Sequence, residues 1–194
     1  MDFSLYVEQK KKEARLENIK EVRKDIHKAW VQEKIANHIA AFDGIMTAEE
    51  IENAILNDII VASKFCKDPS KQNISEKLAA EVLRLKKLPS QGNSCIRFND
   101  NGDIVSTVSG NTKSADFMLN EYYATQKYTG QSGGGQDNQR DDVIDFLKRG
   151  SIKHKVAAIV DGAYWDYWRE ELKEIFANNP NVLITSVTEL SEKT

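Results

Sequence analysis

The stretch Ala115–Gln139, ADFMLNEYYATQKYTGQSGGGQDNQ, decides the fold that we expect for this chain. Two runs rich in aromatic and β-branched residues, 115–119 and 122–128, are separated by a short polar break, which is typical of two neighbouring strands. Asp116 begins the first run and Lys127 lies near the end of the second. Three glycines and a cluster of amides follow. The sequence therefore predicts a hairpin that brings an acid and a lysine together beside a glycine-rich loop.

An Asp and a Lys on adjacent strands can serve the hydrolysis of a phosphodiester. Mg²⁺ prefers carboxylate and water oxygens, and a metal-bound water can be activated for attack. An acid two residues before Lys127 would share its face of the sheet, because side chains alternate along a strand. That position holds Thr125, and the residue before it is Ala124. The only carboxylate of the second run, Glu121, lies in or near the turn.

The remainder of the C-terminal half predicts further strands and two helices. Its order is a meander of strands, then helix, strand, helix and strand, which favours an α/β (α+β) chain with a central mixed sheet flanked by helices. The expected strands outside the hairpin are 94–98, 103–108, 155–161 and 181–187, and the expected helices are 137–150 and 164–179.

The N-terminal half has the pattern of helices. Apolar residues recur at helical spacing over 4–41, with charges between them. Thr47 and Glu50 form a capping-box pattern at the start of a second helix, and Pro89 ends a third. We therefore expect three helices in a helical region 1–88, followed by the sheet region 89–194.

The composition and charge of the chain limit the classes of protein to which it can belong. The net charge of −3 gives no attraction of the whole molecule to nucleic acid, so DNA binding would need a local cluster of basic residues. The two cysteines are far apart and support neither a zinc site nor a disulfide framework. The N-terminus lacks a signal peptide, and no run approaches the 18 or so apolar residues of a membrane span. A cytoplasmic protein that does not enter a membrane is expected.

Several segments together carry a resemblance. They are KLPSQGNS, KSADF, YYATQKYT followed by GGGQDNQRDDVIDFL, and the closing KVAAIVDGAYWDYWREELKEIF and NVLITSVTEL. From about Leu88 to Leu190 the chain resembles type II restriction endonucleases of the PD-(D/E)xK nuclease superfamily. The resemblance implies a restriction-endonuclease-like core that cuts double-stranded DNA with Mg²⁺. It implies that Asp116 binds the metal, that Lys127 orients or activates water, and that Glu81 on the preceding helix assists.

The chain departs from the family pattern at the middle acid, and three interpretations stay open. A replacement at 124 would have removed the acid, so that the original read acid-Thr-Gln with Gln126 in the lysine position. Alternatively, Thr125 and Lys127 belong to a natural variant whose acid comes from elsewhere, such as Glu81. In the third interpretation the fold has lost catalysis and Ala124 is simply part of a silent site.

The loop after the hairpin is a candidate DNA contact. Asn and Gln side chains can read adenine edges or bond to phosphates, and glycines permit close approach. The candidate residues are Gln136, Asn138, Gln139 and Arg140. The alternative is a loop whose polar residues cap the next helix.

The interpretation that we favour is a homodimeric restriction endonuclease, because a palindromic site has two scissile bonds and two-fold symmetry supplies one active site for each. The helical region would serve dimerisation, a DNA clamp, or both. The rival is a catalytically inactive DNA-binding or assembly protein on the same scaffold.

Overall fold

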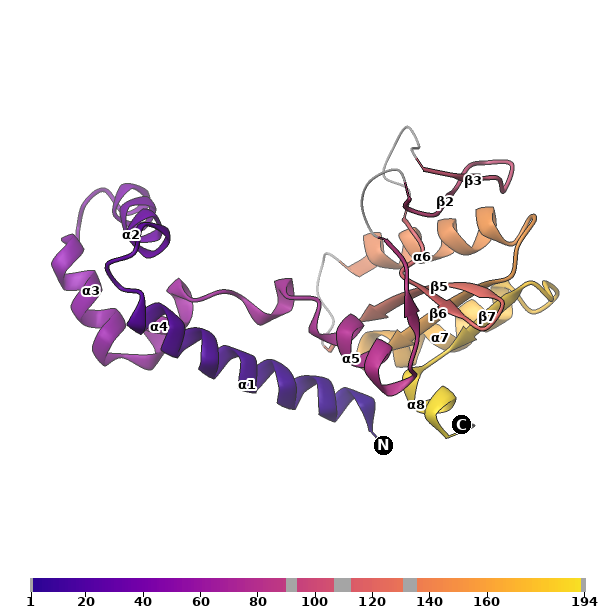
Figure 1. Cartoon of the computed structure of the whole chain (residues 1–194), viewed down its shortest axis with the longest axis horizontal. Helices are drawn as coiled ribbons and strands as arrows, with labels where there is room; N and C mark the ends of the chain where they lie inside the picture. The colour runs from indigo at the N-terminus through magenta and orange to yellow at the C-terminus, as the bar shows by residue number, and fades with distance from the viewer. Residues whose placement is uncertain (1, 90–93, 107–112, 131–135, 193–194) are drawn as a thin grey trace. The chain divides into compact units, whose positions relative to one another are not determined.

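A computed structural model describes residues 2–89, 94–106, 113–130 and 136–192. The chain divides into two compact units (Figure 1): Met1–Val7 together with Ser75–Thr194 form a sheet unit, and Glu8–Ile74 form a helical unit. None of the helices in these ranges is long and apolar enough to cross a bilayer.

The helical unit contains most of α1 (Phe3–Lys24), then α2 (Ala29–Ala41), α3 (Ala48–Asn57), α4 (Ile59–Phe65) and the short η1 (Pro69–Lys71). The predicted capping box is confirmed: the Glu50 N–H donates to Thr47 Oγ1 at 3.3 Å, and the Thr47 N–H donates to Glu50 Oε2 at 2.8 Å. The core of this unit is an aliphatic cluster formed by Ile19, Val22, Val31, Ile35, Ile51 and Ile55.

The N-terminal half has more helices than expected. The helical pattern over 4–41 is broken after Lys24, where the Asp25 carboxylate accepts from the Trp30 indole N–H at 3.2 Å and pairs with Lys28 at 2.9 Å. These local bonds hold a turn between α1 and α2. The structure also differs from expectation in that α5 (Ile74–Val82) belongs to the sheet unit.

The boundary between the units therefore lies at 74/75, not at 88/89 as expected. The side chain of Glu76 in α5 pairs with Lys87 at 2.7 Å, and Leu78 and Ala79 are buried. The first residues of α1 also belong to the sheet unit, where Phe3 and Val7 are fully buried.

The sheet unit is built on a mixed five-stranded sheet with the order β1-β4-β5-β6-β7. Its strands are β1 (Lys86–Lys87), β4 (Phe117–Leu119), β5 (Tyr122–Tyr128), β6 (Val156–Asp161) and β7 (Val182–Thr185). Strands β1, β4 and β5 pair antiparallel, and β5, β6 and β7 pair parallel. The expected mixed sheet flanked by helices is thus present.

The two strands expected near 94–98 and 103–108 do not join this sheet. They are the short β2 (Arg97–Phe98) and β3 (Ile104–Val105), which form a separate two-stranded sheet in the part of the chain that the structure describes. Gly102 lies in the turn between them with φ +78°, and a Cβ there would come within 2.8 Å of Ile152 Cβ. This small sheet therefore packs closely on the end of the following helix.

Two helices cover one face of the main sheet. Helix α6 (Gln136–Gly150) connects β5 to β6, and α7 (Ala163–Ile175) connects β6 to β7. Because both crossovers join adjacent parallel strands in the same direction, both helices lie on the same face. They share one apolar cluster with the strands, which includes Val143, Phe146, Leu147, Val156, Ala158, Val160, Trp165 and Leu172.

The opposite face is also buried. Phe117, Ala124 and Ile159 have no exposed surface. The start of α1 lies on this side, since the Tyr128 hydroxyl donates to the Ser4 carbonyl oxygen at 3.5 Å.

Candidate active site

The β4–β5 hairpin fixes which side chains share a face. Phe117 lies opposite Ala124 in the antiparallel register, so one step further Asp116 lies opposite Thr125. Directly opposed residues project from the same face, and alternate residues of a strand do so too. Asp116, Thr125 and Lys127 therefore share one face, the face that α6 and α7 cover.

The carboxylate of Asp116 is buried, with only 4% of the residue exposed. Its Oδ2 accepts hydrogen bonds from the Thr125 hydroxyl at 3.0 Å and from the Gln126 backbone N–H at 2.9 Å. Its Oδ1 pairs with the Lys113 ammonium at 3.2 Å. Three donors thus hold the carboxylate in one orientation, and a positive charge faces its second oxygen.

Lys127 is half-buried on the same face. Burial is the main cause that lowers the pKa of its ammonium, and the charge of Lys113 lowers it further, whereas Asp116 and Asp142 oppose this. A lysine with a lowered pKa gives up its proton more readily and can then act as a base toward water.

Ala124 and Gln126 lie on the other face of the strand. In the parallel pairing they are opposite Ala157 and Ile159, and both are buried. The interpretation in which Gln126 takes the lysine position beside Asp116 is therefore wrong: period-two alternation directs that side chain away from Asp116. Thr125 occupies the position where the middle acid was expected.

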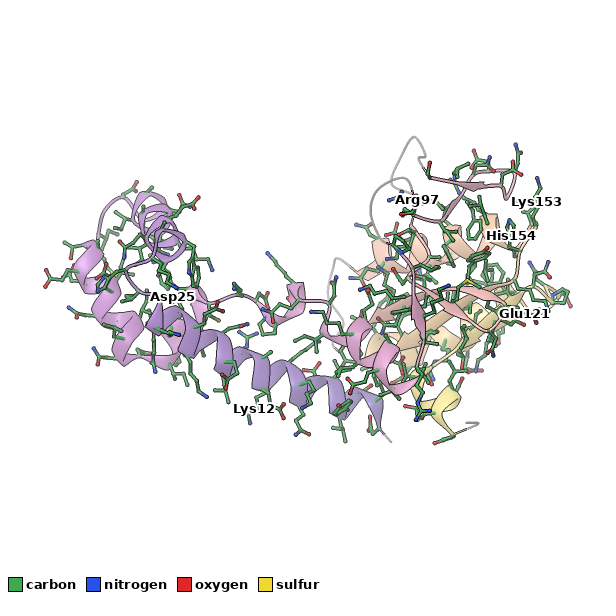
Figure 2. The ribbon with its side chains drawn as sticks, in the orientation of Figure 1. Lys12, Asp25, Arg97, Glu121, Lys153 and His154 are labelled. Atoms are coloured by element: carbon green, nitrogen blue, oxygen red, sulfur yellow. The ribbon has the colours of Figure 1, made fainter. Side chains whose placement is uncertain are left out.

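Two other carboxylates were considered as substitutes for the middle acid. Glu81 is exposed in α5, and no hydrogen bond or ion pair joins it to Asp116 in the described part of the chain. Glu121 is exposed in the β4–β5 turn (Figure 2) and pairs with Lys155 at 2.5 Å. The support of a metal by Glu81 stays a prediction.

The hairpin offers a divalent ion only one protein carboxylate, that of Asp116. Across the residues that the structure describes, no group of three or more His, Cys, Asp or Glu side chains could hold a metal. Mg²⁺ sites on phosphate substrates commonly use one or two carboxylates, and water and substrate oxygens complete the coordination. Oδ1 of Asp116 is already paired with the Lys113 ammonium, so metal binding by Asp116 stays a prediction.

The residues proposed to contact DNA are partly engaged within the sheet unit. The Arg140 guanidinium lies over the Trp168 ring at 4.4 Å and pairs with Asp141 at 3.3 Å. The Gln139 side chain accepts from the Thr129 hydroxyl at 3.4 Å. Asn138 is exposed in the first turn of α6, which leaves it the more accessible amide.

Gln136 is the first residue of α6, and its side chain lies outside the described residues, as does the loop 131–135. The predicted DNA contacts of this loop therefore stay predictions.

Lys113 is the site residue that sequence reasoning missed. It precedes Asp116 by three residues in a segment without regular secondary structure. A lysine before a strand is usually solvated, so nothing in its local pattern separates it from a surface residue.

Asp161 at the end of β6 has a structural role. Both of its carboxylate oxygens accept from the Val187 N–H, at 3.2 and 3.1 Å. The next residue, Gly162, has φ +99°, and a Cβ there would lie 2.3 Å from the Thr129 carbonyl oxygen. Burial raises the pKa of Asp161 to about 7, although the Val187 N–H and Arg169 oppose this.

The raised pKa of Asp161 predicts a loss of stability as pH increases. In the unfolded chain this carboxyl loses its proton near pH 3.8, whereas in the folded protein it keeps the proton up to about pH 7. Between these values the folded state binds the extra proton, so the free energy of unfolding falls as pH rises and then levels off above about 7.

Asp161→Asn can still accept from the Val187 N–H but carries no charge. We expect its stability advantage over the wild type to widen by on the order of 2 kcal/mol between about pH 5 and about pH 8. Urea unfolding of both proteins at the two pH values measures this. A constant difference would contradict the raised pKa.

Comparison of the chain with protein-family models, curated proteins and solved structures found no match. The functional interpretation therefore depends on the geometry of the hairpin and on the sequence resemblance.

Proposed function

We propose that this chain is a Mg²⁺-dependent endonuclease that hydrolyses phosphodiester bonds of double-stranded DNA, on a restriction-endonuclease-like core. The observation that carries the proposal is the arrangement of Asp116, Thr125 and Lys127 on one face of the β4–β5 hairpin. Site-specific cleavage within a restriction–modification system is the form of this activity that the sequence resemblance favours.

Each residue has a distinct role in this proposal. Asp116 would hold Mg²⁺ through its carboxylate, and the ion would supply Lewis acidity that stabilises charge developing on the phosphate. Lys127 would position the attacking water and accept its proton, because its lowered pKa increases the fraction of this lysine that is unprotonated. Thr125 donates to Oδ2 and keeps the carboxylate oriented.

A homodimer follows from the proposed substrate. Double-stranded DNA has one scissile bond on each strand, and each chain carries one such site, so a two-fold dimer would cut both. The helical unit is the proposed region for dimerisation or for clamping DNA.

Cleavage of supercoiled plasmid tests the proposal. The wild type with Mg²⁺ should give discrete linear fragments, and a chelator should abolish them. Lys127→Met should lower the rate at least about a hundredfold, because the water loses its base. Lys155→Met, which removes a lysine from the exposed pair with Glu121, is the matched control and should cut at the wild-type rate.

A second candidate is a catalytically inactive DNA-binding or assembly protein on the same scaffold. It is favoured by Thr125, which stands where the family pattern has an acid. Specific DNA binding with no cleavage by the wild type at any divalent metal concentration would establish this alternative.

A further inference from the structure

A groove on the surface of the helical unit lies between α1 and the start of α4. It is lined by Leu16, Ile19 and Ile59, together with charged side chains of α1. Leu16 and Ile59 are 43% and 53% exposed, and the neighbouring Ile60 is 70% exposed. Asp58 fixes the start of α4, because its Oδ1 accepts from the Ile60 N–H at 2.6 Å. The helical unit therefore carries an ordered apolar strip that is open to solvent.

The charged residues that line the groove are divided by sign along α1. Glu13 and Glu17 lie at one end, and Lys20 and Arg23 lie at the other. Their spacing of three and four residues keeps them on one side of the helix. The helical rise places the first and the last of them about 15 Å apart. A surface with acids at one end, bases at the other and aliphatic side chains between them is complementary to a second copy of itself turned end over end.

We propose that this groove is the interface through which two copies of the chain form a two-fold dimer, with their α1 helices antiparallel. An axis midway between Glu13 and Arg23 along α1 brings Glu13 opposite Arg23 of the second copy and Glu17 opposite Lys20 of the second copy, and symmetry repeats both pairs. The apolar side chains of the groove meet at the centre. The inference rests on the proposed function, which requires a dimer, and names the surface that forms it.

Ion pairs within α1 leave this surface able to bind a partner. Lys20 pairs with Glu17 at 2.7 Å, but these side chains are 73% and 69% exposed. Glu13 pairs with Lys10 at 2.8 Å, again near solvent. Exposed pairs of this kind contribute little to stability, because water and salt screen them. In the dimer each carboxylate gains a second cationic neighbour beside aliphatic side chains that exclude water.

The same charges disfavour DNA as the occupant of the groove. Proteins hold the phosphate backbone with Lys and Arg side chains. Glu13 and Glu17 would repel phosphates along half of the groove. Exposed apolar surface rimmed by charged residues instead fits the surface of another protein. Of the two roles proposed for the helical unit, this groove therefore supports dimerisation.

Charge reversal at the two ends of the groove tests the inference. Glu13→Lys with Glu17→Lys makes the charged side chains of the groove all positive, and Lys20→Glu with Arg23→Gln leaves only negative ones. Gln at 23 keeps an N–H donor for the Ile55 carbonyl oxygen, to which the Arg23 Nε–H donates at 3.0 Å. In sedimentation equilibrium each variant alone should have a dimer Kd at least about tenfold weaker than the wild type, because like charges then face each other. An equimolar mixture of the two should recover the dimer, since opposite charges meet again.

Two further variants serve as control and second test. Glu170→Lys with Glu174→Lys makes the same change of charge at the same spacing on an exposed face of α7, and should dimerise like the wild type. Leu16→Glu places a charge at the apolar centre and should weaken the dimer at least about tenfold. Leu16 is already 43% exposed, so this variant should stay folded, which circular dichroism verifies.

A wild-type dimer whose Kd is the same in Leu16→Glu and in both charge-reversal variants would overturn the inference and leave the endonuclease proposal standing. Failure of the mixture to recover a dimer that each variant alone has lost would also overturn it. If the variants changed affinity for DNA while the mass stayed that of the wild type, the groove would contact DNA instead. A wild type that is monomeric at every concentration would overturn both the inference and the proposed homodimer, and plasmid cleavage by that monomer would decide whether the endonuclease proposal survives.

Discussion

Asp116→Asn is expected to lower DNA cleavage by about a thousandfold or more, equivalent to roughly 4 kcal/mol of activation free energy. The substitution removes the negative charge that would hold the metal. It also leaves the Lys113 ammonium without its carboxylate partner. The side-chain oxygen of Asn can still accept from the Thr125 hydroxyl and the Gln126 N–H, so the hairpin should persist.

The measurement is the initial rate of plasmid cleavage over a range of Mg²⁺ concentrations, with circular dichroism to verify the fold. Asp103→Asn is the matched control, because Asp103 pairs with Lys153 at the exposed turn of the small sheet. It should cut at the wild-type rate. Cleavage by Asp116→Asn within tenfold of the wild type would place the catalytic carboxylate elsewhere.

Glutamates introduced at two adjacent positions of β5 are expected to destabilise the protein to very different extents. Ala124 is fully buried and lies opposite Phe117, so Ala124→Glu would place a carboxylate in an apolar interior without a partner. We expect a loss of roughly 4 kcal/mol or more, enough to unfold much of the protein. Ala124→Gln, which has the same shape without the charge, should be less harmful.

The glutamate side chain of Thr125→Glu, by contrast, would project from the face of the sheet that carries Asp116 and Lys127. Thr125 is fully buried too, but the new carboxylate would lie near the ammonium groups of Lys113 and Lys127, so the loss of stability should be smaller, roughly 2 kcal/mol. It also supplies the middle acid of the family pattern, and Mn²⁺ should bind at least about tenfold more tightly. Urea unfolding and Mn²⁺ titration measure the two effects. A stable Ala124→Glu together with an unfolded Thr125→Glu would reverse the faces assigned here.

The sequence was most informative where local patterns and the period of a strand agree. The hairpin at Asp116 and Lys127, the buried strand before Gly162 and the capping box at Thr47 are each specified by neighbouring residues, and the structure has all three. The mixed sheet followed from the order of the elements. These features needed no knowledge of contacts between distant segments.

Other features depend on such contacts and could not be predicted. The pairing of β2 with β3 rather than with the main sheet depends on the close approach of Gly102 to Ile152. The membership of α5 in the sheet unit depends on the packing of Leu78 and on the ion pair between Glu76 and Lys87. The ion pair of Lys113 depends on the path of the irregular segment before β4. The spacing of residues along the sequence does not predict where the side chains of such a segment lie.

The start of α1 in the sheet unit has a consequence for how the chain folds during its synthesis. The Phe3 N–H donates to Thr188 Oγ1 at 3.5 Å, across nearly the whole sequence. During synthesis, the residues of the helical unit leave the ribosome early and can pack together. Phe3 and Val7 can be buried only after β7 has left the exit tunnel. Until that strand has emerged, these apolar side chains stay uncovered, and such exposed apolar surface favours aggregation of an incomplete chain.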